Sequence, residues 1–279
     1  MMLNIGASRA SRILLYTTLL ACSFLFLMPI FLAFTNSLNP WNSTPSIWPK
    51  SFRFENYADA TTMLDFWSFF KNSLIICAIS VVTTTFSSGL VGYAFARIQA
   101  RGKNVLFMII LATMMLPGIV TQIPMYILFH KFGLLDTFYP WLIWGLGGSP
   151  FFIFLFRQFF SAIPTEIEDA ARIDGCSIFR TYWNIFLPLS LPAIATASIM
   201  SFQFAWGDFI GPFMFLSESK YPLATALSTI GYTQPGNFKL IIQQVSSAAS
   251  FLFMLPVVLV FFIGQRFLVE GIVTTGVKG

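Results

Sequence analysis

Residues 72–96, NSLIICAISVVTTTFSSGLVGYAFA, run without one charged side chain. A charge at the centre of a membrane-spanning helix costs about 2.5–3.5 kcal/mol and a span needs about 20 residues, so charge-free runs locate spans. Five more runs are long enough: 13–49, 104–129, 137–156, 181–207 and 240–265. Asn and Pro residues make the second half of the first run a loop. With their ends adjusted, the runs predict six spans, at about 13–35, 72–96, 104–129, 138–157, 185–216 and 246–267.

The composition excludes two alternatives to a membrane protein. Of the 279 residues, 56% are hydrophobic and 10% are charged, whereas a soluble domain carries about 25% charged residues. A soluble fold leaves much of its surface in water and cannot hide so much apolar area, and a disordered chain lacks apolar residues. The expected fold class is therefore all-α, a polytopic membrane protein with six transmembrane helices in a single domain over 1–279.

Few side chains suit metal, redox or nucleic-acid chemistry. Cys22, Cys77 and Cys176 are too scattered for a disulfide framework or a metal cluster, and His130 is the one histidine. No run of basic residues interleaved with aromatics indicates nucleic-acid binding. We therefore expect no metal, no cofactor bound by this chain and no nucleic-acid partner.

Lysines and arginines in short loops indicate the orientation, because they accumulate on the inner side of the membrane. With the N-terminus inside, the inner segments hold Arg9, Arg12, Arg97, Arg101, Lys103, Arg157, Arg172, Arg180, Arg266 and Lys278. The outer segments hold only Lys50, Arg53, Lys71, Lys131, Lys220 and Lys239. We expect both termini inside. The alternative of a cleaved N-terminal signal is disfavoured by the long apolar stretch and the lack of a small-residue cleavage site.

One inner loop, residues 158–184, differs from the short connectors elsewhere. It holds four of the chain's eleven acids, namely Glu166, Glu168, Asp169 and Asp174. The sequence predicts a short helix here, with Thr165 as the N-cap and Glu168 completing a capping box. Gly175 is predicted to end the helix in a left-handed conformation. A second helical stretch is predicted from about Ser177.

The predicted helix has a face of small residues. Ile167, Ala170, Ala171 and Asp174 follow the spacing i, i+3, i+4 and i+7 and share one side. The alternative is a helix lying in the lipid headgroups, which would have a basic face opposite large apolar residues. The acidic side chains and small residues instead favour a helix that docks into a groove of another protein.

Residues 164–192, PTEIEDAARIDGCSIFRTYWNIFLPLSLP, resemble the EAA loop of the membrane subunits of ABC importers. The family pattern is Glu-Ala-Ala, three further positions and Gly, followed some residues later by Leu-Pro. Its places are taken here by Asp169, Ala170, Ala171, Gly175, Leu187 and Pro188. Asp169 stands where the family usually has Glu, which keeps the charge but shortens its reach.

Three more segments resemble the carbohydrate, or maltose-permease-like, subfamily of these permeases. They are MLPGIVTQIP at 115–124, FQFAWGDFIGPFMFL at 202–216 and QRFLVEGIVTTGVKG at 265–279. The resemblance implies a type I ABC importer permease fold. It also implies the pore subunit of an ATP-driven, binding-protein-dependent importer for a sugar or oligosaccharide. A permease of the same type for glycerol phosphate or a polyol is the alternative.

The resemblance further implies an assembly in the bacterial cytoplasmic (inner) membrane. A second homologous permease subunit completes the pore, two ATPase subunits bind ATP and Mg, and an extracytoplasmic substrate-binding protein delivers the substrate. This chain has no G-x-x-x-x-G-K-[ST] phosphate loop, so it is not expected to be an enzyme. The residues implied in coupling to the ATPase are Glu166, Glu168, Asp169, Ala170, Ala171, Asp174 and Gly175.

Polar side chains within the spans are candidates for the substrate path, because lipid makes them costly. Pro117, Gly118 and Pro124 are predicted to break helical hydrogen bonding in the third span, which is tolerated where the freed groups face protein or a water cavity. Asp208 is expected near the outer surface, close to an interfacial aromatic belt. The candidates are Gln122, Tyr126, Gln203, Trp206 and Asp208. The alternatives are a structural kink for Gln122 and an acid bonded to backbone for Asp208.

Two other classes of function compete with an importer permease. A secondary transporter usually places ionisable residues at the membrane midplane, and none is predicted there. An intramembrane hydrolase would need Ser149 and His130 to meet as nucleophile and base, and no oxyanion or orienting group is evident.

Overall fold

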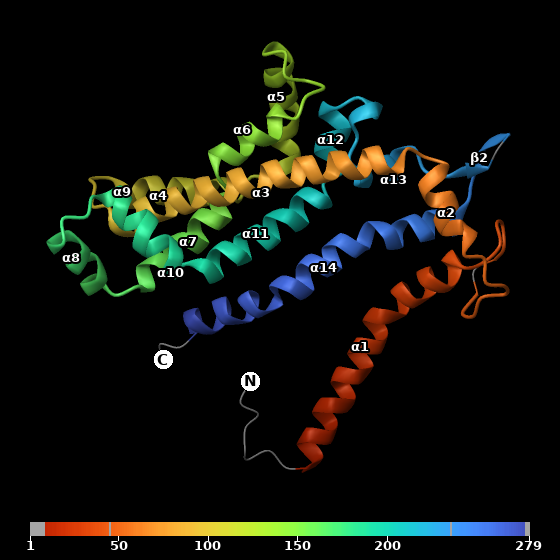
Figure 1. Cartoon of the computed structure of the whole chain (residues 1–279), viewed down its shortest axis with the longest axis horizontal. Coiled ribbons are helices and arrows are strands. Elements are labelled where there is room, and N and C mark those ends of the chain that lie inside the picture. Colours follow the sequence, from red (N-terminus) through yellow and green to blue (C-terminus); the bar gives the residue numbers. More distant parts are fainter. Residues whose placement is uncertain (1–8, 45, 235, 277–279) are drawn as a thin grey trace. The chain divides into compact units, whose positions relative to one another are not determined.

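The computed structural model describes residues 9–44, 46–234 and 236–276. The chain is helical along most of its length, with one short antiparallel hairpin (Figure 1). It forms two compact units. The first contains the residues up to Phe66 together with Ile230–Phe253, and the second contains Trp67–Thr229 and the residues from Met254 onward. Lys278 and the end of the 265–279 segment lie outside the described residues.

The first unit contains a folded loop after the first span. Its elements are α1 (Arg9–Ser37), α2 (Glu55–Thr62), β1 (Thr233–Gln234), β2 (Asn237–Ile241) and the first turns of α14 (Gln243–Gly276). The buried Asn56 donates from Nδ2 to the carbonyl oxygens of Ser37 and Asn39 at 2.7 and 2.8 Å. The Tyr232 hydroxyl donates to the carbonyl oxygen of Ala60 at 2.6 Å. Buried polar contacts therefore hold the loop predicted after 13–35.

The second unit contains the remaining helices. They are α3 (Phe66–Arg97), α4 (Lys103–Thr113), α5 (Gly118–Lys131), α6 (Tyr139–Gly147), α7 (Pro150–Ala162), α8 (Thr165–Ile173), α9 (Ile178–Thr181), the π-helix η1 (Tyr182–Phe186), α10 (Leu187–Leu189), α11 (Leu191–Trp206), α12 (Ile210–Phe215), the 3₁₀ turn η2 (Glu218–Lys220) and α13 (Leu223–Thr229), followed by the rest of α14.

The described residues contain four helical stretches that are long and apolar enough to cross a membrane. These are Arg9–Ser37, Phe66–Arg97, Tyr139–Ala162 and Gln243–Phe267. Two bent pairs raise the number to six if each counts as one span: α4 with α5, bent by 96°, and Ile178–Leu189 with α11, bent by 78°. The prediction of a continuous span over 185–216 is wrong, because the helix bends within it and ends at Trp206.

Proline accounts for the bend between α4 and α5. Pro117 has no N–H group for a helical hydrogen bond and fixes its own φ. α4 accordingly ends at Thr113, and α5 begins at Gly118. The sequence predicts this interruption of helical hydrogen bonding. Pro124, which also has no N–H to donate, lies inside α5, and the helix continues through it.

The second bend follows a widened helical turn. Residues Tyr182–Phe186 form a π-helix, a feature that often marks functional sites. The backbone N–H of Ser190 bonds back to the carbonyl oxygens of Phe186 and Leu187, and the chain then turns into α11. Pro188 and Pro192 flank Ser190 and cannot donate helical hydrogen bonds. The sequence therefore weakens the helix on both sides of the bend.

α3 contributes one buried side chain to each of two hydrophobic clusters in the described part of the second unit. Near its start, Ile76 packs in a cluster with Phe129, Trp141, Phe215 and Leu216. Near its end, Tyr93 belongs to a cluster whose other aromatic members are Phe152, Phe156, Phe160, Tyr182 and Phe186. α3 has no proline and no interruption over its 32 residues, so one continuous helix joins the two clusters.

Gly145 is expected to tolerate no side chain, because α6 crosses α3 there at close range. A Cβ at this position would clash with Oγ1 of Thr83 and would lie 3.2 Å from the backbone nitrogen of Thr84. We expect Gly145→Ala to destabilise the protein by about 1–3 kcal/mol, the usual effect of overpacking. Gly147→Ala is the matched control, since a Cβ there meets nothing within 4 Å. Equal melting temperatures of the two variants in detergent would contradict this packing.

Candidate coupling site

The acid-rich helix is present as α8 and ends as predicted. Gly175 has a φ of +75°, which glycine adopts without strain. The backbone N–H of Cys176 donates to the carbonyl oxygen of Ala171 at 2.9 Å, and that of Gly175 donates to Arg172 at 3.0 Å. These two bonds define a Schellman motif. Within the second unit, α8 lies at the end where α3 and α7 finish (Figure 1).

The predicted capping box at the start of α8 is wrong. Thr165 is the first helical residue, and Pro164 holds the N-cap position with a ψ of 141° and no side-chain hydrogen bond. Oε1 of Glu168 instead accepts a hydrogen bond from Arg172 at 2.6 Å. Pro164 has no side-chain group that could cap the helix, and its ψ of 141° places it outside the helix that begins at Thr165.

Glu168 also forms an ion pair outside its own helix. Its Oε2 lies 3.7 Å from Nη1 of Arg97, the last residue of α3, and the two side chains are only 12% and 7% exposed. The same guanidinium donates to the carbonyl oxygen of Phe160 at 2.6 Å and to that of Ile163. Its central carbon lies 4.9 Å from the ring centre of Phe186. Arg97 therefore contacts α7, α8 and the π-helix at once.

The other side chains of α8 divide between a buried and an exposed side. Ala171 is buried against the chain, whereas Ala170 is exposed, so the two do not present the shared docking face that the spacing predicted. Ile173 is 86% exposed although it is large and apolar. The predicted coupling residues that are exposed are Glu166, Asp169, Ala170, Asp174 and Gly175.

This geometry combines an exposed tip with a buried anchor. The tip, formed by Glu166, Asp169, Ala170, Ile173, Asp174 and Gly175, exposes carboxylates and one large apolar side chain, whereas Glu168 and Ala171 face the rest of the unit. A force applied to the tip would therefore reach the ends of α3 and α7 directly. The sequence prediction missed Arg97, which it counted only as an inner basic residue.

Gln122 is the predicted substrate-path residue with the clearest unmet polar group. Its Oε1 is buried and has no hydrogen-bond partner within the described part of the chain, and it lies in α5 just after the 96° bend. Tyr126, one turn later, stacks on Phe215 with ring centres 6.2 Å apart. Gln203 is exposed on α11. A buried unpaired amide oxygen is costly, so water, substrate or a partner is expected to satisfy it.

The residues at the end of α11 and just after it have structural partners. Trp206, the last residue of α11, is 1% exposed and stacks on Phe202 with ring centres 5.4 Å apart. Oδ1 of Asp208 accepts a hydrogen bond from the backbone N–H of Gly211 at 3.1 Å. The geometry of Asp208 thus matches the alternative of an acid bonded to backbone.

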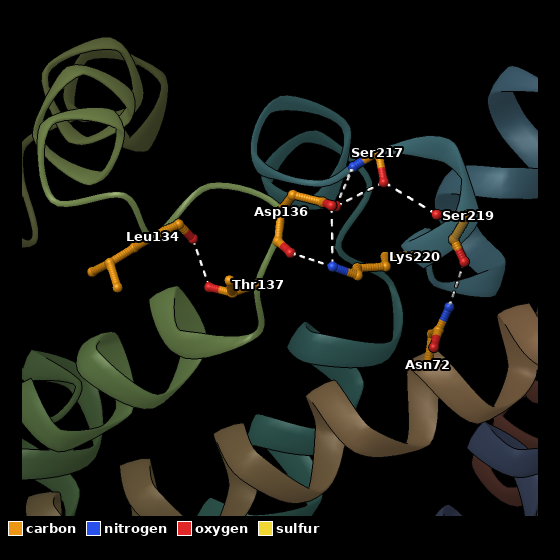
Figure 2. A network of polar contacts seen from close by, with 7 residues as sticks. All are labelled: Asn72, Leu134, Asp136, Thr137, Ser217, Ser219 and Lys220. Carbon is orange, nitrogen blue, oxygen red and sulfur yellow. Dashed lines mark hydrogen bonds and ion pairs between the residues drawn. The ribbon is translucent and has the colours of Figure 1, made fainter.

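A polar network, shown in Figure 2, lies at the N-terminal end of α3. Oδ1 of Asp136 accepts from the backbone N–H and the hydroxyl of Ser217 at 2.9 and 2.7 Å, and Oδ2 lies 3.0 Å from Nζ of Lys220. Asn72 of α3 donates to the carbonyl oxygen of Tyr221 at 3.2 Å. The network joins the α5–α6 loop, the segment between α12 and α13, and α3. The sequence analysis did not predict it.

Asp136 is expected to stabilise this network over most of the pH range. Hydrogen bonds from the Ser217 backbone and hydroxyl, assisted by Lys220, hold the pKa of the Asp136 carboxyl below its ordinary value of 3.8. A lowered carboxyl pKa stabilises the fold above pH 3.8, and this contribution is lost as the pH falls through the folded-state pKa.

Asp136→Asn therefore should lower stability at pH 7. We expect a loss of about 1 kcal/mol or less, because both charged groups are nearly half exposed and screened. Asn also tolerates the φ of +56° at this position. Glu218→Gln, which removes an exposed carboxylate beside Ser217, is the control in a detergent melting experiment. If Glu218→Gln lowered the stability as much as Asp136→Asn does, the polar network would not be the cause of the loss.

The two residues of the hydrolase alternative have other contacts. The backbone N–H of Ser149 donates to Oγ of Ser88 at 2.9 Å, and the His130 ring stacks on Tyr126. In the described part of the chain, no hydrogen bond joins Ser149 to His130, and no group of three metal-binding side chains occurs.

Comparison with known proteins decides the family. Residues 88–273 match the model of the family described as binding-protein-dependent transport system inner membrane component. The match covers more than half of the sequence. The chain belongs to this family. It is a permease subunit of an ABC importer rather than an enzyme, and membership implies a membrane complex with a partner permease and an ATPase.

Relatives of this permease extend over almost its whole length. It is 30% identical to the arabinooligosaccharides transport system permease protein AraQ of Bacillus subtilis, with 96% of each chain covered. It is 32% identical to the probable starch degradation products transport system permease protein AmyC of Thermoanaerobacterium thermosulfurigenes, with 92% and 93% covered. A crystal structure of a bacterial ABC transporter involved in the import of the acidic polysaccharide alginate matches with a TM-score of 0.80. Identity there is 25%, over 94% of this permease and 99% of that chain, which confirms the predicted permease fold.

Proposed function

We propose that this permease is one half of the pore of an ATP-driven importer and that α8 couples it to the ATPase subunits. The observation that carries the proposal is α8 itself, an exposed acidic and apolar tip on a helix anchored by Glu168 and Ala171. When ATP closes the ATPase pair, α8 moves with it and displaces the helices to which it is bound. The pore then changes from inward-open to outward-open.

The substrate proposed is a sugar or oligosaccharide. The named functions of the relatives support this class, since they concern arabinooligosaccharides, starch degradation products and alginate. A phosphate-bearing substrate would favour basic groups along the path, and the candidate Gln122 is neutral. A polyol or glycerol phosphate remains the alternative substrate to be tested.

The proposed assembly contains a second homologous permease, two ATPase subunits that bind ATP and Mg, and an extracytoplasmic binding protein. The excess of basic residues in the inner segments supports cytoplasmic N- and C-termini, with α8 on the cytoplasmic side. The bacterial cytoplasmic membrane is the proposed location. Both compact units act in this proposal as one permease domain.

Uptake by the reconstituted complex tests the proposal. The complete transporter is placed in vesicles with ATP inside, and uptake of labelled oligosaccharides, polyols and glycerol phosphate is compared. We expect ATP-dependent uptake of a saccharide that continues when proton and sodium gradients are collapsed. Uptake that stops with those gradients while ATP is maintained would overturn the proposal in favour of a secondary transporter. Uptake of glycerol phosphate alone would overturn the substrate class.

A further inference from the structure

We propose that Arg97 is a positioning residue that makes α8 and α3 move as one body, so that α3 carries the coupling movement to the opposite end of the unit. The inference rests on the proposed function, because it presupposes that α8 docks on an ATPase. It concerns a residue outside the 158–184 loop. Three steps lead to it, each from the contacts of the second unit.

The first step is the convergence of contacts on one guanidinium. Arg97 pairs with Glu168 of α8, donates to the carbonyl oxygens of Phe160 and Ile163 at the end of α7, and covers the ring of Phe186. Arginine suits this position, since its planar group can donate in several directions and stack on an aromatic ring.

The second step is burial. Arg97 is 7% exposed and Glu168 is 12% exposed. Removing one partner from such a pair leaves an uncompensated charge, which is strongly unfavourable. The pair therefore resists separation when α8 is pulled. By contrast, the pair of Glu168 with Arg172 lies within α8, and Arg172 is 63% exposed, so it cannot transmit movement to another element.

The third step is the continuity of α3. At 1.5 Å per residue its 32 residues span about 48 Å, whereas the helix pairs α4–α5 and α9–α11 are bent by 96° and 78°. At its far end, Asn72 donates to the carbonyl oxygen of Tyr221, and Oγ of the buried Ser73 accepts from the backbone N–H of Leu223 at 2.7 Å. A displacement of Arg97 thus reaches the 217–223 segment without crossing a helix break.

Reciprocity follows from thermodynamic linkage. If ATP binding moves the outer end of α3 through Arg97, then a ligand that binds the outer end must change the ATPase side by the same coupling free energy. The substrate-loaded binding protein therefore should raise the affinity of the ATPase side for ATP through Arg97. Because hydrolysis follows the ATP-driven closure in the proposed function, its stimulation by the loaded binding protein should also depend on Arg97, while unstimulated hydrolysis by the ATPase subunits should not.

The experiment compares Arg97→Gln with Arg101→Gln in the complete reconstituted transporter. Arg101 is an exposed basic residue four positions further on and serves as the matched control. We expect Arg97→Gln to reduce stimulation of ATP hydrolysis by the loaded binding protein at least about fivefold, the lower bound of typical allosteric coupling. Glu168→Gln should do the same, and the double variant should be no worse than either single one. Arg101→Gln should keep full stimulation.

A second measurement covers the case in which Arg97→Gln does not assemble. Spin labels on the exposed positions Ile98 and Thr165 of the otherwise wild-type complex report the distance between α3 and α8. We expect this distance to stay constant between the ATP-free and ATP-bound states. A change of distance on ATP binding, or full stimulation in Arg97→Gln, would overturn the inference. Absence of ATP-driven uptake by the wild-type complex would instead overturn the proposed function.

Discussion

Gly175→Asp is expected to abolish ATP-driven uptake while the transporter still assembles in the membrane. Gly175 ends α8 with a φ of +75°, and a Cβ there would meet nothing within 4 Å in this chain. Aspartate tolerates the left-handed conformation better than most residues, so the permease itself should still fold. The new carboxylate would instead stand at the exposed tip, where a like charge or lost space in the interface costs several kcal/mol.

Two variants separate the causes of this effect. Gly175→Asn has nearly the same size and also tolerates the left-handed conformation, but it adds no charge. Gly175→Ala adds a small group and backbone strain of about 1–2 kcal/mol. Uptake and ATP hydrolysis are measured side by side in vesicles. Loss in both the Asp and Asn variants indicates a steric block, whereas loss in Asp alone indicates charge. Unchanged uptake by Gly175→Asp would count against docking through α8.

Ile173→Asp is expected to weaken binding of the ATPase subunits to the permease. Ile173 is the last residue of α8 and is 86% exposed, and the neighbouring side chains of Ile178 and Phe179 are 55% and 68% exposed. An exposed apolar group of this kind is typical of an interaction site. Loss of a central interface contact costs about 2 kcal/mol or more, so the affinity should fall at least about thirtyfold.

Co-purification of the ATPase subunit with the solubilised permease measures this loss. Ile241→Asp is the control, because Ile241 is 62% exposed on β2 of the first unit and is not part of α8. Equal recovery of the ATPase with the Ile173→Asp and control variants would show that the exposed tip of α8 is not a binding surface.

The helices were predictable because the membrane imposes a strong rule on charge. Runs such as 72–96 and 240–265 contain no charged residue. The first lies wholly in α3, and residues 243–265 of the second lie in α14. The bends were only partly predictable. Pro117 breaks a helix but Pro124 does not, because the chain on either side decides whether a missing hydrogen bond is tolerated.

The capping residues in the sequence of α8 predicted the end of the helix better than its start. Gly175 stops the helix as its sequence position suggested, since few other residues adopt a positive φ easily. At the start, Thr165 and Glu168 have the spacing of a capping box, but Pro164 takes the N-cap position and Arg97 competes for the carboxylate. The competing partner comes from α3, far away in sequence, and only the folded chain reveals it.

The polar network around Asp136 could not be predicted for the same reason. Ser217 and Lys220 lie in a different loop, and no sequence spacing links them to Asp136. Polar residues are common in loops, so the residue types alone did not indicate that these side chains form a network. Three-dimensional proximity turned these residues into a connected network at the end of α3.

Site-specific photo-cross-linking at Ile173 tests the central claim most directly. A cross-linking residue at this position is activated in membranes that contain the complete transporter, with the same residue at position 241 as the control. Docking of α8 predicts an adduct between position 173 and the ATPase subunit, and none between position 241 and that subunit. An adduct of position 173 with lipid alone would contradict the account.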